Sequence, residues 1–593
     1  MKREERSGAQ SDYQAWRDGL EAEAQARRQA ALARLATADD VRVWAAELRA
    51  WFRQVVGQLP LPAQPAAPVL TGTIERDGYR IEKWLFETMP GTWTSSNLYI
   101  PDRPHPGGVA MCAPLGHWTQ GKAQTDYQQM AGFMALHGIP VLVYDHAGVG
   151  ERREFINPVS GLSAVGKSPT DEHNHTGALA TLAGIPPCRL FLAEAAQASA
   201  FLASFPFVDR SRIGFSGASG GGTISAFAGA YLEDVAFSIP VCIIADDGVS
   251  GSGDAEQQCP DSGVRGVALV DLLAALVPRP AMIIREKGFA LTERSWAMLH
   301  RLYGLAGAAQ AAAYAPIEDV HGYTHPMVEA AYAFLAGNFS LPRLDITAWT
   351  RVRLLDEHAT WCTPAGCLLR DRPQVTVQEQ VARLAPRPSG LTRERLAQLL
   401  GIADLARSPA PPSFAGEASG RVPVAGAHSA LPGALGLLDW PELPADYYGP
   451  GQSALYRSTA AGESRRLPAF GRSLLGLRVR QILDFAADHR GRIAEFAASG
   501  EWSLPLALAC ALAPAADLPC ATVRDLPLRH RDQLSARLGT ASLSACVPGL
   551  LAAGDTEDIL ALCGGRLRVE GFADAEGRAV AAVRAGCPAA DQP

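Results

Sequence analysis

The chain has 593 residues, a formal net charge of −7 and 19% charged residues. This length exceeds a single ordinary core, so two or three domains are expected. A hydrophobic content of 48% excludes a largely disordered chain. The mild acidity argues against a nucleic-acid-binding protein, which normally has a basic face. No apolar run reaches the roughly 18 residues that a membrane-spanning helix needs.

The first residues read MKREERSGAQSDYQ and contain no apolar signal segment. A cytoplasmic protein is therefore expected, with a secretory signal trimmed from the chain as the open alternative. The 11 cysteines form no C-x-x-C pair, and H-E-x-x-H is absent from the sequence. This usage indicates reduced thiols and argues against a zinc site. We expect no cofactor, no nucleic-acid partner and no membrane partner, and we leave a homo-oligomer open.

The first part of the chain is predicted to be helical. Residues 11–57 carry apolar and alanine positions at roughly helical spacing, with Arg and Glu between them. The proline-rich stretch 60–68 breaks this pattern. Strand-like runs at 72–75, 79–87 and 96–100 then predict an antiparallel opening to a sheet.

After this opening, strands alternate with helices, which predicts a mostly parallel sheet covered by helices on both faces. The expected strands are 108–112, 141–144, 212–216, 237–245, 281–284 and 311–314. The expected helices are 124–137, 186–205, 220–231, 293–303 and 327–335.

Composition divides the chain into three expected parts. A helical N-terminal segment with a Pro-rich linker occupies 1–69, and the first α/β domain occupies 70–344. Residues 405–450 are rich in Pro, Gly, Ala and Ser and are expected to form loops. They lie in a second α/β domain, 345–593, which begins after a border near residue 344.

Two pairs of segments echo each other between these domains. Residues 269–280 are followed by AMII, and residues 555–565 are followed by RLRV. In both 189–213 and 478–493, a helix precedes an Arg-Ile strand entry. The echoes keep their order along the chain, which indicates a weak internal duplication.

The motif with the clearest chemistry is a G-x-S-x-G. Residues 212–223 read RIGFSGASGGGT, with Ser219 between Gly217 and Gly221. A strand leads in and a small-residue helix leads out. A sharp turn there lifts the serine oxygen above the sheet, and the glycines allow the backbone to approach closely. Ser216 is a rival, but it lies within the expected strand, so Ser219 is the candidate nucleophile.

A serine hydroxyl needs a base, and the expected chain order is serine, acid, histidine. His321 lies downstream in the segment VHGYTHP, after the last expected strand. A loop there can reach the serine from the carboxyl edge of the sheet. His325 is the alternative, although Pro326 follows it and marks a helix start. We therefore expect His321 to be the base.

Two backbone amides are expected to hold the oxyanion. One belongs to Gly220, directly after the nucleophile. The other is expected from the loop PLGHW, residues 114–118, in which Gly116 permits the turn. His117 and Trp118 would then face the pocket. The alternative for His117 is a purely structural loop histidine.

Together these motifs resemble the acetyl-xylan-esterase-like branch of the α/β-hydrolases, which neighbours dienelactone hydrolases and prolyl-oligopeptidase-type catalytic domains. The resemblance covers roughly residues 70–340 well and the C-terminal third loosely. It implies an α/β-hydrolase fold and a Ser-His-acid mechanism with an acyl-enzyme, but no particular substrate. It rests on residues 71–101, GHWTQGK at 116–122, YDHAGVGE at 144–151, RIGFSGASGGG at 212–222 and HGY at 321–323.

The sequence departs from this family pattern at the acid. Such enzymes usually carry an aspartate just after the strand 281–284, where this chain reads REKGFALTE with Phe289 at the expected place. Glucuronoyl esterases, a more distant resemblance, place the acid after the preceding strand. Asp246 and Asp247 stand there, and we favour Asp247 because it is closer to the turn at Gly248. Glu286 and Glu256 remain alternatives.

The stretch 246–256 holds four carboxylates among Gly and Ser. Their spacing does not fit the twelve-residue calcium loop, so no metal site is expected. The strand-to-helix turn that carries Ser219 is called the elbow below. In the second domain, its place corresponds to SGEWSL, residues 499–504, with Glu501 at the nucleophile position. Leu504 and Pro505 would obstruct a tight turn. We expect a degenerate hydrolase-like domain without catalytic activity.

The favoured function is a serine esterase that hydrolyses a carboxylic ester, either an acylated carbohydrate or a small-molecule acyl ester. A prolyl-oligopeptidase-type peptidase is the first alternative. The roughly 70 residues ahead of the catalytic domain are too few for the propeller of such enzymes. A lyase or a binding module is the second alternative, and the altered acid keeps it open.

Overall fold

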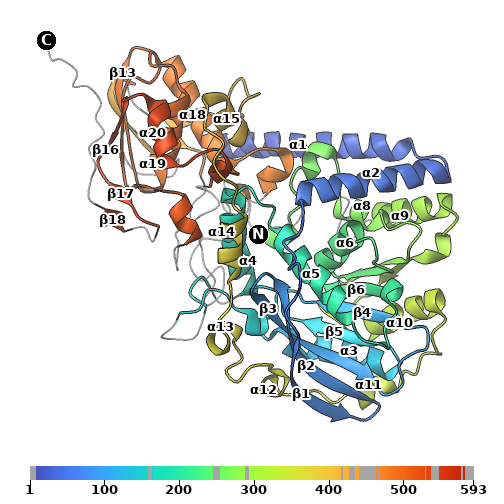
Figure 1. Cartoon of the computed structure of the whole chain (residues 1–593). Helices are drawn as coiled ribbons and strands as arrows, with labels where there is room; N and C mark the ends of the chain where they lie inside the picture. The colour runs from blue at the N-terminus through green and yellow to red at the C-terminus, as the bar shows by residue number, and fades with distance from the viewer. Residues whose placement is uncertain are drawn as a thin grey trace. The chain divides into compact units, whose positions relative to one another are not determined.

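The structure is a computed structural model of the chain (Figure 1). It describes residues 8–580 apart from internal gaps. The gaps are 158–162, 167, 245–253, 288–292, 416–417, 427–433, 440–462, 465, 528, 536–545 and 576–577. Asp246, Asp247 and Phe289 therefore lie outside the described residues.

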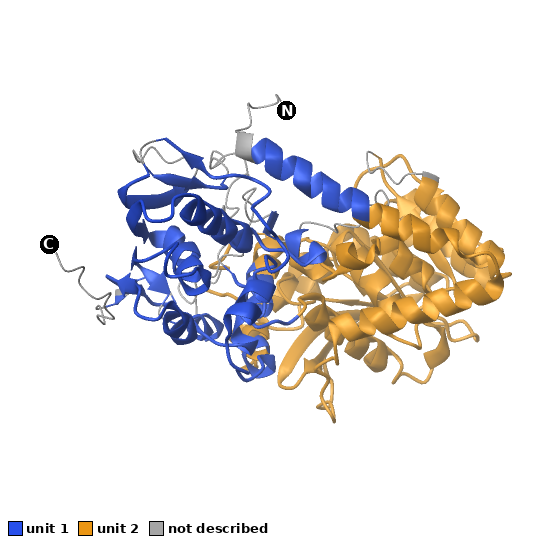
Figure 2. Ribbon diagram, turned by 90° about the horizontal axis from the view of Figure 1, so that it is seen from above, with its two compact units in different colours: residues 1–23, 175–185, 381–593 blue, residues 24–174, 186–380 orange. Residues whose placement is uncertain are grey.

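The chain forms two compact units (Figure 2). Unit 1 comprises residues 1–23, 175–185 and 381–593, and unit 2 comprises residues 24–174 and 186–380. Three of the described helices have residues in both units: α1 (Gly8–Ala33), α4 (Pro169–Leu182) and α14 (Val377–Leu384).

The division differs from the expected border at residue 344, because residues 345–380 are part of unit 2. This segment forms only short helices, which are too small to build a core. It bonds instead to strand β3 (Thr92–Pro101), where the Thr92 hydroxyl donates to the Val375 carbonyl at 2.7 Å.

The N-terminal segment, expected as one helical stretch, contains two helices. The second, α2 (Ala38–Val56), begins with a capping box in which Thr37 accepts from the Asp40 amide and Asp40 accepts from the Thr37 amide. α2 belongs to unit 2, where Phe52 packs against Phe227 with ring centroids 5.1 Å apart.

Unit 2 is built on a nine-stranded sheet of order β1-β2-β3-β5-β4-β6-β7-β8-β9. The strands β1 to β3 are antiparallel to their neighbours. The six strands β4 to β9 run parallel to one another. This confirms the predicted antiparallel opening followed by a mostly parallel sheet. Besides β3, the strands are β1 (Val69–Arg76), β2 (Tyr79–Met89), β4 (Ala110–Pro114), β5 (Val141–Tyr144), β6 (Ile213–Ala218), β7 (Ser238–Val241), β8 (Ala281–Arg285) and β9 (Ala312–Pro316).

Helices cover both faces of this sheet, with α3 and α10 on one face and α5 and α6 on the other (Figure 1). Alternating strand residues such as Met111 and Val143 pack against α3 and α10 in one buried cluster. The helices of unit 2 besides α2 are α3 (Thr125–Leu136), α5 (Cys188–Leu202), α6 (Gly220–Tyr231), α7 (Ser262–Arg265), α8 (Leu269–Ala274), α9 (Glu293–Leu305), α10 (His325–Phe339), α11 (Ala348–Arg351), α12 (Glu357–Thr360) and α13 (Leu368–Asp371).

A buried ion cluster joins the loops that follow β4 and β5. The Lys122 ammonium lies 2.7 Å from Asp145 Oδ2 and also donates to Glu151, and all three side chains are at most 1% exposed. Burial alone would lower the pKa of Lys122, but the carboxylates of Asp145 and Glu151 outweigh burial and raise it. The cluster thus holds the end of the loop that contains residues 116–118.

Replacing this ammonium should be costly. We expect Lys122→Met to lower the free energy of unfolding by about 3–5 kcal/mol, because two buried carboxylates lose their counter-ion. Denaturant unfolding measures the loss. The matched control is Lys287→Met at an exposed position, where a change below about 0.5 kcal/mol is expected. Equal stabilities of the two variants would contradict the role given to the cluster.

Unit 1 contains a second, mostly parallel sheet of order β10-β12-β11-β13-β14-β16. A three-stranded sheet, β15-β17-β18, completes its strands. The strands are β10 (Ser413–Phe414), β11 (Gly420–Gly426), β12 (Leu435–Leu437), β13 (Ile493–Ser499), β14 (Ala521–Arg524), β15 (Leu526–Pro527), β16 (Leu567–Val569), β17 (Phe572–Ala573) and β18 (Ala579–Val580). Its described helices besides parts of α1, α4 and α14 are α15 (Arg393–Leu399), α18 (Leu474–Asp488), α19 (Ser503–Leu512) and α20 (Thr556–Cys563).

The two sheets repeat one strand order. The parallel strands β5-β4-β6-β7-β8 of unit 2 correspond in sequence order and direction to β12-β11-β13-β14-β16 of unit 1. The two echoes found in the sequence fall at matching places. Helices α5 and α18 precede the third strand of each set, and α8 and α20 precede the fifth. This agreement supports the predicted duplication.

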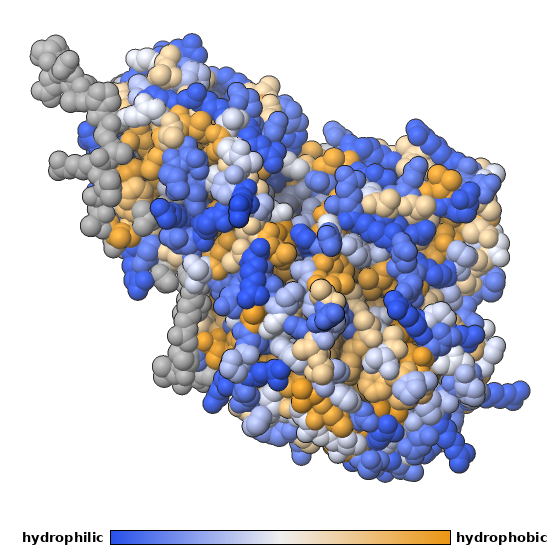
Figure 3. Space-filling view, in the orientation of Figure 1, coloured by the Kyte–Doolittle hydropathy of each residue, from blue (hydrophilic) through white to orange (hydrophobic). Residues whose placement is uncertain are grey.

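Exposed apolar side chains lie on several elements. On the face drawn in Figure 3, apolar residues are interspersed with polar ones. Leu70 on β1 and Ile346 after α10 are 47% and 59% exposed. Scattered exposure of this kind is normal for a folded protein. Among the described residues, none of the helices is both long and apolar enough to cross a membrane.

Candidate active site

The G-x-S-x-G motif forms a tight strand-to-helix turn at the carboxyl end of β6. Strand β6 ends at Ala218 and helix α6 begins at Gly220, so Ser219 alone makes the turn. Its backbone has φ 58° and ψ −124°, a strained conformation for a residue with a side chain. Strain of this kind concentrates at functional sites, and it leaves the Ser219 side chain half-buried at the edge of the sheet.

Close backbone packing explains the glycines of the motif. A Cβ on Gly221 would lie 2.1 Å from the Pro114 carbonyl oxygen, and a Cβ on Gly217 would lie 2.6 Å from the same atom. The loop after β4 therefore presses against the first turn of α6. Tyr127 braces this contact, since its hydroxyl accepts from the Ala218 amide and donates to the Pro114 carbonyl.

The rival serine is part of the core. Ser216 is 1% exposed, and its hydroxyl donates to the Ile239 carbonyl and lies 2.7 Å from the Tyr323 hydroxyl. Both contacts hold the Ser216 hydroxyl in the buried core, whereas Ser219 stands at the edge of the sheet.

His321 forms a pair with Glu286. His321 Nδ1 lies 2.8 and 2.9 Å from the two carboxylate oxygens of Glu286. Glu286 directly follows β8 and is 5% exposed, whereas the His321 side chain, in the loop after β9, is 44% exposed. A proton held at Nδ1 leaves Nε2 as the nitrogen for proton transfer.

The usual aspartate position of the loop after β8 is occupied by Phe289, which lies outside the described residues. Glu286 in the same loop, one of the alternatives that the sequence left open, accepts a hydrogen bond from His321 Nδ1. The favoured acid, Asp247, and its neighbour Asp246 lie outside the described residues, so their assignment stays a prediction. Glu256, the other alternative, bonds to His117 at 2.6 Å.

The other histidine of the segment, His325, starts α10. It stacks on Trp349 with ring centroids 4.4 Å apart and pairs with Glu329. This is the helix-start position that the following proline predicted.

A thiol that the sequence analysis did not single out lies beside the His321–Glu286 pair. Cys242 follows β7 with φ 57°, and its sulfur lies within 4.8 Å of the facing atoms of both partners. Burial raises the pKa of Cys242 to about 12, so the thiol stays protonated at neutral pH. It acts here as a neutral neighbour of the acid.

The loop after β4 approaches both the elbow and His321. A Cβ on Gly116 would lie 2.3 Å from the Trp118 ring and 2.8 Å from the Ala218 carbonyl oxygen. The Trp118 ring in turn stacks on His321, with centroids 5.8 Å apart and an interplanar angle of 28°. Trp118 thus connects the elbow region to the histidine loop.

Asp126, at the start of α3, holds the histidine loop from the other side. Its Oδ2 accepts from the Tyr323 amide at 2.8 Å, next to Gly322 with φ 119°. Burial raises the pKa of Asp126. No local motif marks Asp126, so sequence reasoning did not find it.

His117 lies beside the first residue of α6. A Cβ on Gly220 would come within 2.9 Å of Glu256 Oε1 and 3.0 Å of His117 Nε2. The absence of a side chain at Gly220 therefore makes room for the His117–Glu256 pair. The structure brings four of the residues singled out in the sequence close to Ser219 or to the histidine loop: Gly220, Gly116, His117 and Trp118.

The corresponding turn of unit 1 has different chemistry. Between β13 and α19, Gly500 has φ 58°, the value found at Ser219. This places Gly500, rather than the expected Glu501, at the turn. Trp502 next to it carries the buried Arg478 guanidinium 4.5 Å over its ring, and Ser503 donates to the Arg524 carbonyl. The turn offers no serine in the strained conformation.

If unit 1 does no chemistry, Glu501→Ala should hydrolyse esters nearly as fast as the wild type. The two proteins should differ in transition-state stabilisation by less than about 0.5 kcal/mol. Steady-state kinetics on any ester that the wild type turns over tests this, with thermal unfolding as the control for folding. A collapse of kcat at unchanged stability would show that the second turn takes part in catalysis.

Comparison with known proteins identifies one matching family model and several similar solved structures. Residues 21–166 match the model of an Abhydrolase family; this segment includes the loop at Gly116 and ends before Ser219. A solved structure named Methylesterase BT1017 is similar with a TM-score of 0.50 and 22% identity, over 64% of this chain and 80% of that one. No curated protein matches the chain.

Two further solved structures are similar at lower scores. A candidate acetyl xylan esterase from Bacteroides fragilis has a TM-score of 0.39 and 16% identity, over 48% of this chain and 76% of that one. A glucuronoyl esterase catalytic domain from Hypocrea jecorina has a TM-score of 0.34 and 13% identity, over 51% and 84%. Together with the sheet order and the serine turn, the family match and the first structure show that the chain has the fold of the α/β-hydrolase superfamily.

Proposed function

We propose that this protein is a serine hydrolase of carboxylic esters, with Ser219 as nucleophile, His321 as base and Glu286 as the acid that orients it. The conformation of Ser219 carries the proposal. A serine with φ 58° between a central parallel strand and a glycine-rich helix is held in strain, which the protein maintains only when the position is useful.

The pairing of His321 with Glu286 supports the same chemistry. Glu286 accepts a hydrogen bond from the Nδ1 proton of His321, which leaves Nε2 unprotonated as the basic nitrogen. Nε2 accepts the Ser219 proton as the oxygen attacks the ester carbonyl. It then gives that proton to the leaving alcohol, and water releases the acid from the acyl-enzyme by the same steps.

The expected oxyanion donors are the amide of Gly220 and an amide of the loop 114–118. The contact of that loop with Gly221 supports this assignment, because it brings the loop to the first turn of α6. The positive end of the α6 dipole adds to the stabilisation of a developing negative oxygen.

The substrate is proposed as an acylated carbohydrate or another small acyl ester. The test is a panel of p-nitrophenyl esters of increasing acyl length and of acetylated sugars, with mass spectrometry of the quenched enzyme. The proposal predicts release of the carboxylic acid and a transient mass increase equal to the acyl group. Turnover without an acyl-enzyme would contradict the nucleophilic role of Ser219.

A further inference from the structure

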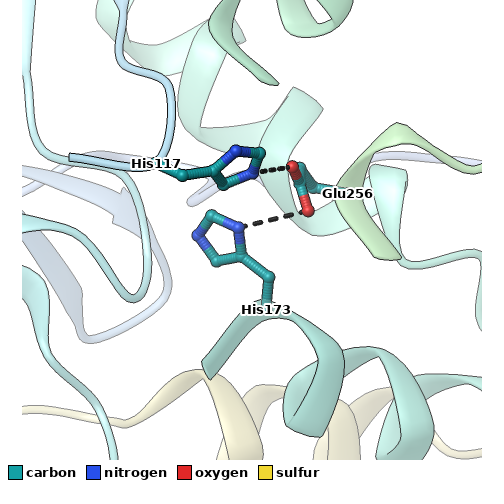
Figure 4. A group of neighbouring side chains, drawn as sticks. All are labelled: His117, His173 and Glu256. Carbon is teal, nitrogen blue, oxygen red and sulfur yellow. Dashed lines mark hydrogen bonds and ion pairs between the residues drawn. The ribbon is translucent and has the colours of Figure 1, made fainter. Parts of the chain in front are cut away.

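Two histidines and a glutamate converge next to the elbow (Figure 4). His117 comes from the loop after β4, His173 from α4 and Glu256 from the turn before α7, and all three lie in unit 2. His117 Nε2 lies 2.6 Å from Glu256 Oε1, and His173 Nδ1 lies 3.1 Å from Glu256 Oε2. One donor atom from each residue lies within 4.8 Å of the others.

A contact with a backbone carbonyl fixes the orientation of the His173 ring. Its Nε2 lies 2.9 Å from the Ala147 carbonyl oxygen and therefore carries the proton. This contact turns Nδ1 toward Glu256 Oε2, so that both atoms are directed into the same buried place. A histidine whose outer nitrogen donates to a backbone carbonyl is the arrangement that orients metal-binding imidazoles.

The carboxylate of Glu256 is buried between the two histidines. Its side chain is 0% exposed, and within the described part of the chain its ion pairs are with the two imidazoles. Gln257 adds one neutral donor at 3.0 Å. A buried carboxylate needs compensating charge, and a cation between it and two imidazoles supplies that charge.

We propose that His117, His173 and Glu256 bind a divalent transition-metal ion of the zinc class. Two imidazole nitrogens and one carboxylate are the ligands that this class of ion prefers, and three protein ligands leave a further position open. Asp254 Oδ2 lies 3.7 Å from His117 Nε2 and is a further carboxylate beside the site, on a side chain that is 23% exposed.

The position of the site gives the ion a role that rests on the proposed function. The pair His117–Glu256 stands over Gly220, whose amide is the expected oxyanion donor. A cation there adds positive charge beside the first turn of α6, where the ester oxygen becomes negative. The ion thereby assists Ser219 without replacing it.

The test uses the full-length protein after chelation and dialysis, titrated with zinc chloride by calorimetry and analysed for bound metal by mass spectrometry. The proposal predicts one zinc per chain. His117→Ala, His173→Gln and Glu256→Gln should each weaken zinc binding by more than about 100-fold, because losing a ligand costs more than losing an outer partner. Thermal unfolding checks that each variant folds, and zinc should raise the melting temperature of the wild type but not of these three ligand variants.

Two control variants distinguish this site from zinc binding elsewhere on the protein. His325→Ala removes a histidine at the start of α10, and Cys242→Ser removes a member of the second ligand-like group, Cys242, Glu286 and His321. Both should bind zinc as the wild type does. A thiolate-to-metal absorption band on cobalt substitution, lost in Cys242→Ser, would place the ion in that second group and overturn the proposal.

The metal site and the proposed hydrolase can fail separately. Ser219→Ala should bind one zinc although it hydrolyses no ester. Sub-stoichiometric zinc in the wild type and in Ser219→Ala, with hydrolysis intact in the wild type, would overturn the metal site and leave the serine mechanism standing. The three side chains would then form a hydrogen-bonded His–Glu–His group.

Discussion

Ser219→Ala should abolish ester hydrolysis, with kcat lowered by about four to six decades. The alanine has no oxygen to form the acyl-enzyme, and His321 then has nothing to deprotonate. The backbone at residue 219 keeps the same positive φ with either side chain, so the fold should survive the change. Burst and steady-state kinetics on the best ester measure the loss, and circular dichroism confirms folding.

The matched control for this change is Ser216→Ala, three residues earlier in β6. It removes hydrogen bonds to Ile239 and Tyr323 and should act on stability far more than on kcat. If Ser219→Ala kept more than about a tenth of the wild-type rate, it would have lost less than about 1.4 kcal/mol of transition-state stabilisation. Ser219 would then not be the nucleophile.

Glu286→Gln should lower kcat by about two to four decades with little change in KM. The glutamine keeps the size of the side chain, but it removes the charge that stabilises the imidazolium and offers an N–H where Nδ1 needs an acceptor. The 2.8 Å contact between His321 Nδ1 and Glu286 is the basis of this expectation.

Three further variants complete the experiment: Glu286→Asp, Asp246→Asn and Asp247→Asn. The shorter carboxylate should restore part of the rate, which a merely structural role of Glu286 would not require. The two asparagine variants should stay near wild type. If Asp247→Asn lost activity while Glu286→Gln stayed active, Glu286 would not be the acid. Asp247, which the sequence favours, would then be the acid instead.

Local sequence patterns predicted the elements that depend on neighbouring residues. The alternation of apolar runs and helices indicated the parallel sheet, and the glycines around Ser219 indicated the turn, because close packing against Pro114 requires them. The same reasoning placed the end of β7 at residue 245, whereas the structure ends this strand at Val241. Its short length is set by pairing with β8 rather than by apolar content.

Contacts between distant loops could not be predicted in this way. The family pattern places the acid at residue 289 and so gives no reason to prefer Glu286 to Asp247, although the acid needs only to reach His321 in space. The stacking of Trp118 on His321 and the bond between His117 and Glu256 join segments more than 130 residues apart. Their geometry depends on how several loops settle at one sheet edge.

The division into two compact units also differs from the border expected near residue 344, for a related reason. The segment 345–380 has no apolar pattern of its own strong enough to indicate where it packs. Its hydrogen bonds to β3, such as Thr92 to Val375, assign it to unit 2.

Labelling with a fluorophosphonate followed by peptide mapping tests the central claim most directly. The probe reacts with a serine only when a base activates it, so it reports on Ser219 and His321 together. We expect one adduct per chain, on the peptide that contains Ser219, and none in Ser219→Ala or His321→Ala. An adduct on Ser499 or Ser503 in unit 1, or no adduct in an enzyme that hydrolyses esters, would contradict the assignment of Ser219 as the nucleophile.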